Sequence, residues 1–539
     1  MAEQAGAKKK TLLHHFRLVS LLTLGSRVLG MARDVAMAVM FGNGVILDSF
    51  TLAFRLPNLA RTILGEGTLS TAFLPVYVRE MMSVGPQAAD RLASVFLLFL
   101  VALLGAIVVV FELGVLGLSL ALSMSDEFRL LLELNAIMFP YILLICLSAQ
   151  LNAVLNAREH FAWPALMPWI LNLTWLAAVL MSWWLMETPT GRIQFISLSI
   201  ILGGLAQLAG SWLALTRCGF VLSRDVGGDA WKTDWERVKG LLWSLTPILL
   251  SLSVTQLNTL LDSVIAWGLA YVHGFVEAGG LAWLPKFSDG SASALYIGQR
   301  LYQFPLGIFG VALGTVLYPR LTKARHEDGN AFAQEVLKGL RLILLLGLPA
   351  SVGLCLMAQP VTETLFHHGA FDMEDVTQTS QMIVGYGVGV WAFMLLLIMN
   401  RAFYALEDRW TPLLAGFISV AVNIVMSFTL IMFLNAPGLA VATSVASAVQ
   451  VGWLLWKLKQ KTPSIKLRSL CRLMGISLIG CFVMGLVSNV LFPQLENQDM
   501  STFWRGVSIL TQIAVCGVAY GAVVVGMGVE EVRGGWKRS

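Results

Sequence analysis

Charged residues are scarce in this sequence of 539 residues. Only 13% of them are Asp, Glu, Lys or Arg, whereas 57% are hydrophobic, and the mean hydropathy is +0.74. A soluble globular protein carries about twice that share of charge, so this class is excluded. Ten-residue stretches of alternating polarity, which would indicate a β-barrel, are missing as well. The chain must therefore use lipid as its solvent.

Cysteine pairs and enzyme motifs are also missing. The six cysteines are scattered without a C-x-x-C pair, which argues against disulfide or metal chemistry. His367 and His368 have no carboxylate or cysteine partner at ligand spacing. There is no Walker motif, and the longest inside loop, about residues 218–239, is too short for an ATPase domain. We expect neither an enzyme nor a tightly bound cofactor.

Long apolar stretches are what the sequence does contain. A window of about 19 residues finds roughly fourteen that could cross the bilayer as helices. They cover approximately residues 17–41, 48–82, 92–122, 130–156, 163–186, 194–217, 240–272, 293–319, 336–358, 378–406, 411–433, 437–457, 468–492 and 503–527. The fold class predicted is an all-α polytopic membrane protein with about fourteen transmembrane helices.

The distribution of basic residues predicts the orientation. One set of loops is basic, holding Arg320, Lys323, Arg325, Lys457, Lys459 and Lys461 among others. The opposite loops hold little more than Arg129, Arg192 and Lys286. By the positive-inside rule, both termini face the cytoplasm. The net charge of +5 then reflects topology and contact with anionic membrane lipids, not nucleic-acid binding.

The sequence repeats itself at an offset near 245 residues. Arg55 and Pro75 in the second span match Arg300 and Pro319 in the eighth. A further trio, Ala157, Glu159 and Pro164, matches Ala405, Glu407 and Pro412. We expect two pseudo-symmetric six-helix lobes, residues 1–220 and 221–460, followed by two helices and a cytoplasmic tail in residues 461–539. Such parallel repeats enclose a central site near the membrane midplane.

Ionisable residues inside the spans are the most informative ones, because each costs about 2.5 to 3.5 kcal/mol at a helix centre. They must face one another or water. The set is Arg27, Arg33, Asp34, Asp48, Arg55, Arg61, Glu66, Asp262, Arg300 and Arg401.

Two interpretations of these charges remain open. Asp34, Asp48, Arg55 and Glu66 suit buried ion pairs that fix helix packing, with Arg27 and Asp34 on one helical stripe. In contrast, arginines outnumber carboxylates, so a net-positive cavity lined by four arginines would accept an anion such as a pyrophosphate. The four are Arg27, Arg33, Arg61 and Arg300.

A second polar set lies in the C-terminal half. Asp262 in the seventh span could meet Asn423 and Ser427 in the eleventh and Thr443 in the twelfth. Oxygen ligands around one carboxylate could hold a monovalent cation, tentatively sodium. A hydrogen-bonded packing cluster explains the same residues equally well.

Several motifs make the family recognisable over about the first 460 residues. They are Ser26-Arg27-Val28-Leu29-Gly30-Met31-Ala32-Arg33-Asp34, Arg55-Leu56-Pro57-Asn58-Leu59 leading to Arg61, Gly65-Glu66-Gly67, and Arg300-Leu301-Tyr302-Gln303-Phe304-Pro305. This pattern closely resembles the MurJ (MviN) lipid II flippases of the multidrug/oligosaccharidyl-lipid/polysaccharide exporter superfamily.

The resemblance implies a flippase that moves lipid II, the undecaprenyl-pyrophosphate-linked peptidoglycan precursor, across the bacterial inner membrane by alternating access. It implies that Arg27, Arg33 and Arg300 bind the pyrophosphate, with Arg61, Asp48 and Glu66 in supporting or gating roles. It also implies a sodium site at Asp262, Asn423 and Thr443. This chain departs from the family at Gln299 and Ser427, and in an insertion at residues 273–292.

Three rival functions fit parts of the sequence, and one of them is a non-transporting membrane scaffold. A flippase for another polyprenyl-pyrophosphate-linked glycan, of the O-antigen type, would share the cationic cavity. A drug/cation antiporter would need twelve helices and an acidic cavity.

Overall fold

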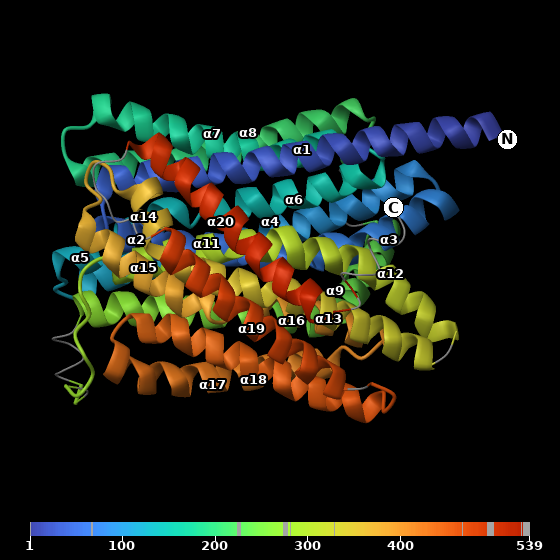
Figure 1. Ribbon diagram of the computed structural model, residues 1–539. Helices are drawn as coiled ribbons and strands as arrows, with labels where there is room; N and C mark the ends of the chain where they lie inside the picture. Colours follow the sequence, from blue (N-terminus) through green and yellow to red (C-terminus); the bar gives the residue numbers. More distant parts are fainter. Residues whose placement is uncertain are drawn as a thin grey trace. The chain divides into compact units, whose positions relative to one another are not determined.

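The computed structural model describes residues 2–65, 68–223, 228–272, 279–280, 282–327, 329–465, 467–492, 501–529 and 531. Over these residues the secondary structure is helical, without a strand, which confirms the all-α prediction (Figure 1). The chain divides into two compact units, Met1–Gln256 and Leu257–Ser539, and each is described by itself.

In its described residues, the N-terminal unit contains eight α-helices, one π-helix and the start of a ninth α-helix. Their bounds are α1 (Ala2–Phe41), α2 (Val45–Ala60), η1 (Arg61–Gly65), α3 (Thr68–Ser83), α4 (Pro86–Ala121), α5 (Asp126–Met138), α6 (Tyr141–Ala157), α7 (Ala162–Leu185), α8 (Pro189–Arg217) and α9 (Asp229–Tyr271).

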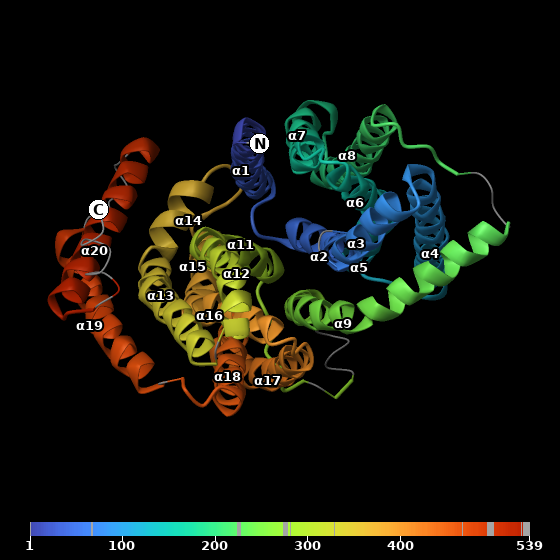
Figure 2. The same ribbon diagram turned by 90° about the vertical axis from the view of Figure 1, so that its right-hand side faces the viewer.

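Packing in this unit follows the apolar faces of the helices. Helix α7 lies between α1 and α8, α2 packs on α5, and α3 packs on α4 and α6 (Figure 2). The rings of Phe50, Phe54 and Trp175 meet at centroid distances of 5.0 to 6.3 Å. This buried aromatic contact joins α2 to α7 and fixes the helix pair around the polar residues described below.

In its described residues, the C-terminal unit contains the rest of α9, ten further α-helices and one π-helix. Their bounds are α11 (Ser291–Pro305), η2 (Leu306–Val311), α12 (Ala312–Glu327), α13 (Gly329–Leu356), α14 (Ala358–Phe366), α15 (Met373–Gly387), α16 (Val390–Ala405), α17 (Trp410–Leu434), α18 (Pro437–Lys461), α19 (Leu467–Leu491) and α20 (Thr502–Gly526).

Three packed pairs organise this second unit. Helices α17 and α18 form a hairpin, α13 lies against α16, and α11 lies against α15 (Figure 2). Helix α19 packs on α13 and pairs with α20, and the Tyr520 hydroxyl of α20 donates to the Leu345 carbonyl at 2.9 Å. The part of the insertion at residues 273–278 and 281 lies outside the described residues. Beyond it, the Phe287 amide donates to the Leu269 carbonyl at 3.1 Å.

Two unusual backbone features recur in both units, at matching places of the sequence repeat. The π-helices begin at Arg61 and at Leu306, which is the offset that relates Arg55 to Arg300. Glu159 and Glu407 adopt left-handed conformations, with φ of 61° and 60°. The following amides then bond back five residues, from His160 to Leu155 and from Asp408 to Phe403, each at 3.0 Å. Because non-glycine residues rarely adopt this conformation, the match is structural support for the duplication.

The span count was only partly predicted. Ten helices of the described chain are long and apolar enough to cross a membrane, and α15 with α16 makes an eleventh candidate with a bend of 42°. The number fourteen is therefore not confirmed. The division at residues 1–220, 221–460 and 461–539 stays a prediction; the two compact units meet within α9, between Gln256 and Leu257.

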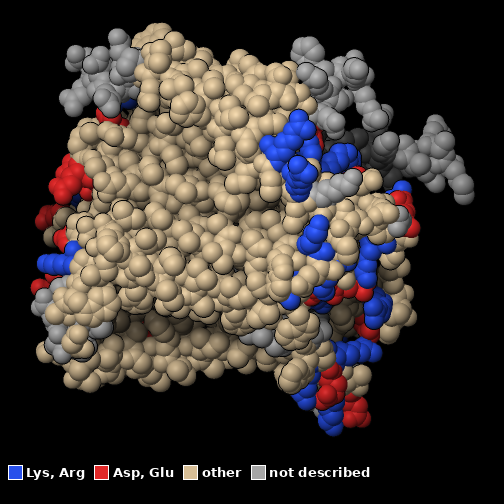
Figure 3. All heavy atoms as spheres, turned by 60° about the horizontal axis from the view of Figure 1, so that its bottom comes forward, with Lys and Arg blue, Asp and Glu red and all other residues tan. Residues whose placement is uncertain are grey.

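The surface agrees with a lipid environment. On the face shown in Figure 3, Lys and Arg gather at one edge, and the wide area beside them carries almost no charge. Large exposed side chains on the outer helices are apolar, including Val110, Trp184, Phe433, Phe482 and Leu510. An exposed apolar surface of this extent is stable only in contact with lipid tails.

Close packing of the α17–α18 hairpin gives a stability prediction. A Cβ at Gly438 would lie 2.7 Å from the Leu430 carbonyl carbon and 2.8 Å from the Ile431 amide nitrogen, both backbone atoms. We expect Gly438→Val to lower the free energy of unfolding by about 1 to 3 kcal/mol, the usual cost of overpacking. Thermal unfolding of the purified protein in detergent measures this. Gly452→Ala on the same helix, where a Cβ meets nothing within 4 Å of the described structure, is the matched control. Equal midpoints for the two variants would contradict the packing.

Candidate functional site

Arg33 is locked in a buried cluster between α1 and α7. Its Nη2 lies 2.6 Å from Asp34 Oδ1, and its Nη1 donates to Asn172 Oδ1 at 3.0 Å. The guanidinium also stacks on Trp175, 3.9 Å from the ring centroid, and Arg33 is only 4% exposed. Asn172 in turn donates to the Ser26 carbonyl at 3.1 Å. The charge of Arg33 is therefore neutralised within the unit, and its donors serve helix packing.

Arg27 has a different environment, although it lies less than two helical turns before Arg33. It is exposed on α1, and the described residues offer it no hydrogen bond or ion pair. Asp34 pairs with its neighbour Arg33 and not with Arg27, which shares its helical stripe. An unneutralised guanidinium on a membrane helix must face water or an anion. Of Arg27 and Arg33, Arg27 thus has the free charge that anion binding requires.

Three of the ionisable residues predicted inside the spans, Asp48, Arg55 and Arg61, lie on α2 and η1. Asp48 is fully buried, and Arg55 is half-buried further along α2. Arg61 is the first residue of η1, and its Nη2 donates to Asn58 Oδ1 at 2.8 Å. The π-helix changes the direction of side chains relative to a regular helix, which sets the position of Arg61. Glu66 lies outside the described residues.

Arg300 belongs to the C-terminal unit and is half-buried on α11. Its Nε and Nη2 donate to the Tyr296 hydroxyl at 3.1 and 2.7 Å, and the guanidinium lies 4.9 Å from the centre of that ring. The preceding Gln299 donates to the Tyr386 hydroxyl at 3.0 Å. This neutral amide holds α11 on α15. That Arg300 converges with the arginines of α1 stays a prediction.

The second predicted set does come together, as a continuous chain of hydrogen bonds. The Ser427 hydroxyl donates to Asn423 Oδ1 at 2.7 Å, and Asn423 Nδ2 donates to Thr443 Oγ1 at 2.9 Å. The Thr443 hydroxyl then donates to Asp262 Oδ2 at 2.7 Å. We call these four residues the polar chain; it joins α9 to α17 and α18.

The chemistry of the polar chain fits a hard cation. Asp262, Asn423 and Ser427 are each no more than 1% exposed, and the side-chain oxygens comprise one carboxylate, one amide and two hydroxyls. Such a set of oxygen donors suits an alkali or alkaline-earth cation rather than a transition metal. The same hydrogen bonds also agree with a packing cluster, so the cation-binding and packing interpretations both remain open.

Three residues with clear roles were missed by the sequence analysis. They are Asn172 and Trp175, which hold Arg33, and Tyr296, which holds Arg300. A lone amide in the apolar segment of α7 was the available signal for Asn172, but its partner lies 139 residues away.

Comparisons with known proteins agree on one family. The family model described as lipid II flippase MurJ matches residues 37–506. The probable lipid II flippase MurJ of Rhizobium tropici is 30% identical over 517 residues, covering 94% of this chain and 91% of that protein.

Solved structures show the same fold. A lipid II flippase MurJ in an inward closed conformation superimposes with a TM-score of 0.74 at 23% identity, covering 94% of this chain and 98% of that one. An inward-facing multidrug resistance transporter of the MATE family, in the MOP superfamily, has a TM-score of 0.63 at 12% identity, covering 82% and 98%. Both likenesses are below 25% identity and concern architecture alone.

The Arg33 cluster gives the second prediction. Asn172→Leu removes the acceptor of Arg33 Nη1 and the donor to the Ser26 carbonyl, and leaves these buried groups unsatisfied. We expect a loss of about 1 to 3 kcal/mol in the free energy of unfolding. Thermal unfolding in detergent measures it, with Leu173→Ala, at a half-exposed neighbouring position, as the control. If Asn172→Leu unfolds at the wild-type temperature, Arg33 is not held by this contact.

Proposed function

This chain belongs to the MurJ family of lipid II flippases, and from that premise we propose that it carries lipid II from the inner to the outer leaflet of the bacterial inner membrane. The family match over residues 37–506 is the observation that carries this proposal. Transport of this kind makes and breaks no covalent bond, so we propose a transporter and not an enzyme.

We propose that Arg27 and Arg300 are the primary ligands of the pyrophosphate. Arg27 is exposed on α1 without an ion pair among the described residues, which leaves all its donors for a ligand. Two hydrogen bonds to the neutral Tyr296 hydroxyl hold the Arg300 guanidinium in place on α11. Guanidinium groups bind phosphate oxygens through two parallel hydrogen bonds, which a diphosphate can accept from both residues.

Arg33 and Arg61 take secondary roles in this proposal. Arg33 reaches the diphosphate only by exchanging its bonds to Asp34 or Asn172, so it chiefly positions α1. Arg61 is held by a neutral amide and contributes positive charge from η1. Asp34, Asp48, Arg55 and Glu66 are the supporting and gating residues. Asp34 already supports Arg33 in this way.

We propose alternating access as the mechanism, driven in part by the membrane potential. An inside-negative potential favours outward movement of the anionic lipid by about 2.3 kcal/mol per charge per 100 mV. The emptied, positively charged site is drawn inward by the same potential. One arginine-rich site can therefore serve both half-cycles without ATP.

We propose that both termini are cytoplasmic. In the C-terminal unit, Arg325 pairs with Glu407 at 3.2 Å, so the end of α12 lies at the end of α16. Arg341, in the first half of α13, donates to Glu531 at 2.8 Å, close after α20. The end of α20 therefore lies on the basic side of this unit, which supports a cytoplasmic C-terminus by the positive-inside rule.

We propose that the polar chain binds sodium. Asp262 supplies the negative charge, and the oxygens of Asn423, Ser427 and Thr443 supply the remaining protein ligands. When bound, the ion would replace the hydrogen bonds that now join α9 to α17 and α18.

The arginine assignment predicts a loss of transport. Arg27→Ala and Arg300→Ala each remove a charge-assisted contact worth about 1.5 to 3 kcal/mol, and we expect neither to support growth of cells depleted of their own lipid II flippase. Lipid II should then accumulate in the cytoplasmic leaflet. Arg27→Lys should restore growth only in part, because an ammonium group lacks the guanidinium fork.

Lys232→Ala is the control for a surface cation, since that side chain is 73% exposed. Full growth of cells carrying Arg27→Ala, at wild-type protein levels, would eliminate the proposed pyrophosphate site.

The sodium assignment predicts a cation-specific stabilisation. The wild-type protein should unfold at a higher temperature in NaCl than in KCl of equal concentration. At a sodium concentration one hundred times the dissociation constant, binding should raise the free energy of unfolding by about 2.7 kcal/mol. Asp262→Asn should abolish the difference. Ser263→Ala should retain it, because the Ser263 hydroxyl donates to Thr259 outside the polar chain. A wild-type midpoint that is the same in both salts would refute sodium binding.

A further inference from the structure

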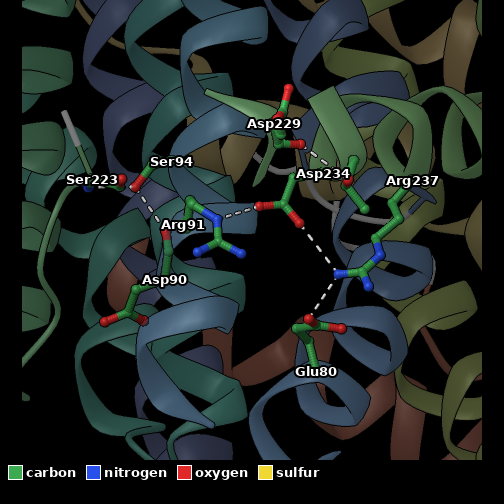
Figure 4. Close-up of polar contacts among 9 residues, drawn as sticks. Glu80, Asp90, Arg91, Ser94, Ser223, Asp229, Asp234 and Arg237 are labelled. Atoms are coloured by element: carbon green, nitrogen blue, oxygen red, sulfur yellow. Dashed lines mark hydrogen bonds and ion pairs between the residues drawn. The ribbon is translucent and has the colours of Figure 1, made fainter. Parts of the chain in front are cut away.

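A partly buried cluster of ions, in which the side chains of Arg91 and Arg237 are 30% and 41% exposed, joins α9 to α3 and α4 within the N-terminal unit (Figure 4). Asp234, near the start of α9, accepts from Arg91 Nε of α4 at 2.6 Å and from Arg237 Nη1 at 3.2 Å. Arg237 Nη1 also donates to Glu80 Oε1 at 2.7 Å, near the end of α3. We name Glu80, Arg91, Asp234 and Arg237 the α9 anchor.

Charge in the α9 anchor is balanced and partly removed from water. Two carboxylates face two guanidiniums, and the side chains of Asp234 and Glu80 are 1% and 11% exposed. A carboxylate as buried as Asp234 is stable only while its cationic partners stay in place. Movement of the start of α9 away from α4 would strand that charge, so the cluster favours one fixed arrangement.

Further hydrogen bonds attach the segment between α8 and α9 to α4, next to the α9 anchor. Asp90, next to Arg91, accepts from Arg158 Nη2 and from the Tyr77 hydroxyl, and its second oxygen accepts from the Val221 amide at 3.2 Å. The Ser94 hydroxyl oxygen, one turn further along α4, accepts from the Ser223 amide at 3.0 Å. The chain that leaves α8 is thus docked on α4 before α9 begins.

Two other ion pairs at the start of α9 are of a different kind. Lys232 with Asp229 and Lys239 with Glu236 join residues three apart on the helix, and their side chains are 48% to 100% exposed. Exposed pairs within one helix contribute little to stability. They serve as an internal comparison, because they share the helix but not the burial.

The anchored helix is the one that continues into the C-terminal unit. α9 runs unbroken from Asp229 to Tyr271, and Asp262 near its other end belongs to the polar chain. Both ends are therefore fixed by a buried carboxylate, each to a different unit of the chain.

We propose that Glu80, Arg91, Asp234 and Arg237 are positioning residues for lipid II transport, and that the α9 anchor stays closed through the whole transport cycle. This inference rests on the proposed function. The anchor makes the start of α9 a permanent part of the N-terminal unit. A switch, in contrast, would have to open once in every cycle.

Replacement of ions by apolar side chains distinguishes an anchor from a switch. Asp234→Asn leaves Arg91 without its carboxylate; we expect backbone hydrogen exchange in residues 229–240 to become about tenfold faster or more, and growth support to fall. Asp234→Leu combined with Arg91→Met keeps the contact as an apolar one, while Arg237 remains paired with Glu80. For this double variant we expect slow exchange and growth near the wild-type level.

Asp229→Asn, at the fully exposed carboxylate of the same helix, is the control and should change neither readout. Unchanged exchange in Asp234→Asn would overturn the anchor. Slow exchange in the double variant without growth support would also overturn it, since a closed cluster would then block the cycle. Hydrogen exchange does not depend on lipid II, so failure of the anchor and failure of the proposed function give different results.

Discussion

A guanidinium inside a membrane must be neutralised or must reach water, and the architecture of this chain depends on that constraint. Arg27 and Arg33, in the second half of α1, meet it in opposite ways. Arg33 is enclosed by Asp34, Asn172 and Trp175, whereas Arg27 is exposed without an ion pair in the described structure. Arg33 thus holds the helix in place, whereas the charge of Arg27 stays available, which is why we propose Arg27 as a ligand of the diphosphate. A binding site for a diphosphate needs both, because a free charge is useful only on a fixed backbone.

The same backbone features occur at matching places in both units, and each unit secures them in its own way. A π-helix follows Arg55 on α2 and follows Arg300 on α11, so the backbone changes pitch after each of these arginines. The turn that contains Glu159 is secured when Arg158 donates to the Cys218 carbonyl at 2.7 Å. The matching turn at Glu407 is secured when Arg325 donates to the Ala405 carbonyl at 2.8 Å. An arginine fixes the equivalent turn in each unit, but it comes from a different helix.

Local sequence patterns predicted much of the fold and part of the site. Apolar length located most spans, and the four residues of the polar chain were found because each is polar in an otherwise apolar helix. The breaks at Phe139 and Gly389 were not predicted, because both interrupt hydrophobic runs that a hydropathy window reads as continuous. The partnership of Arg33 with Asn172 was not predictable either, since helix periodicity pairs residues a few positions apart and says nothing of α7 against α1.

The central claim is that Arg27 and Arg300 recognise a diphosphate, and direct binding tests it more closely than any assay of growth. The measurement is the affinity of the purified protein, in lipid nanodiscs, for lipid II and for the polyprenol that lacks the diphosphate and sugar. The account predicts that lipid II binds in a salt-sensitive manner, that polyprenol does not displace it, and that Arg27→Ala with Arg300→Ala weakens binding about tenfold or more. Equal binding of polyprenol, or unchanged affinity in the double variant, would contradict it.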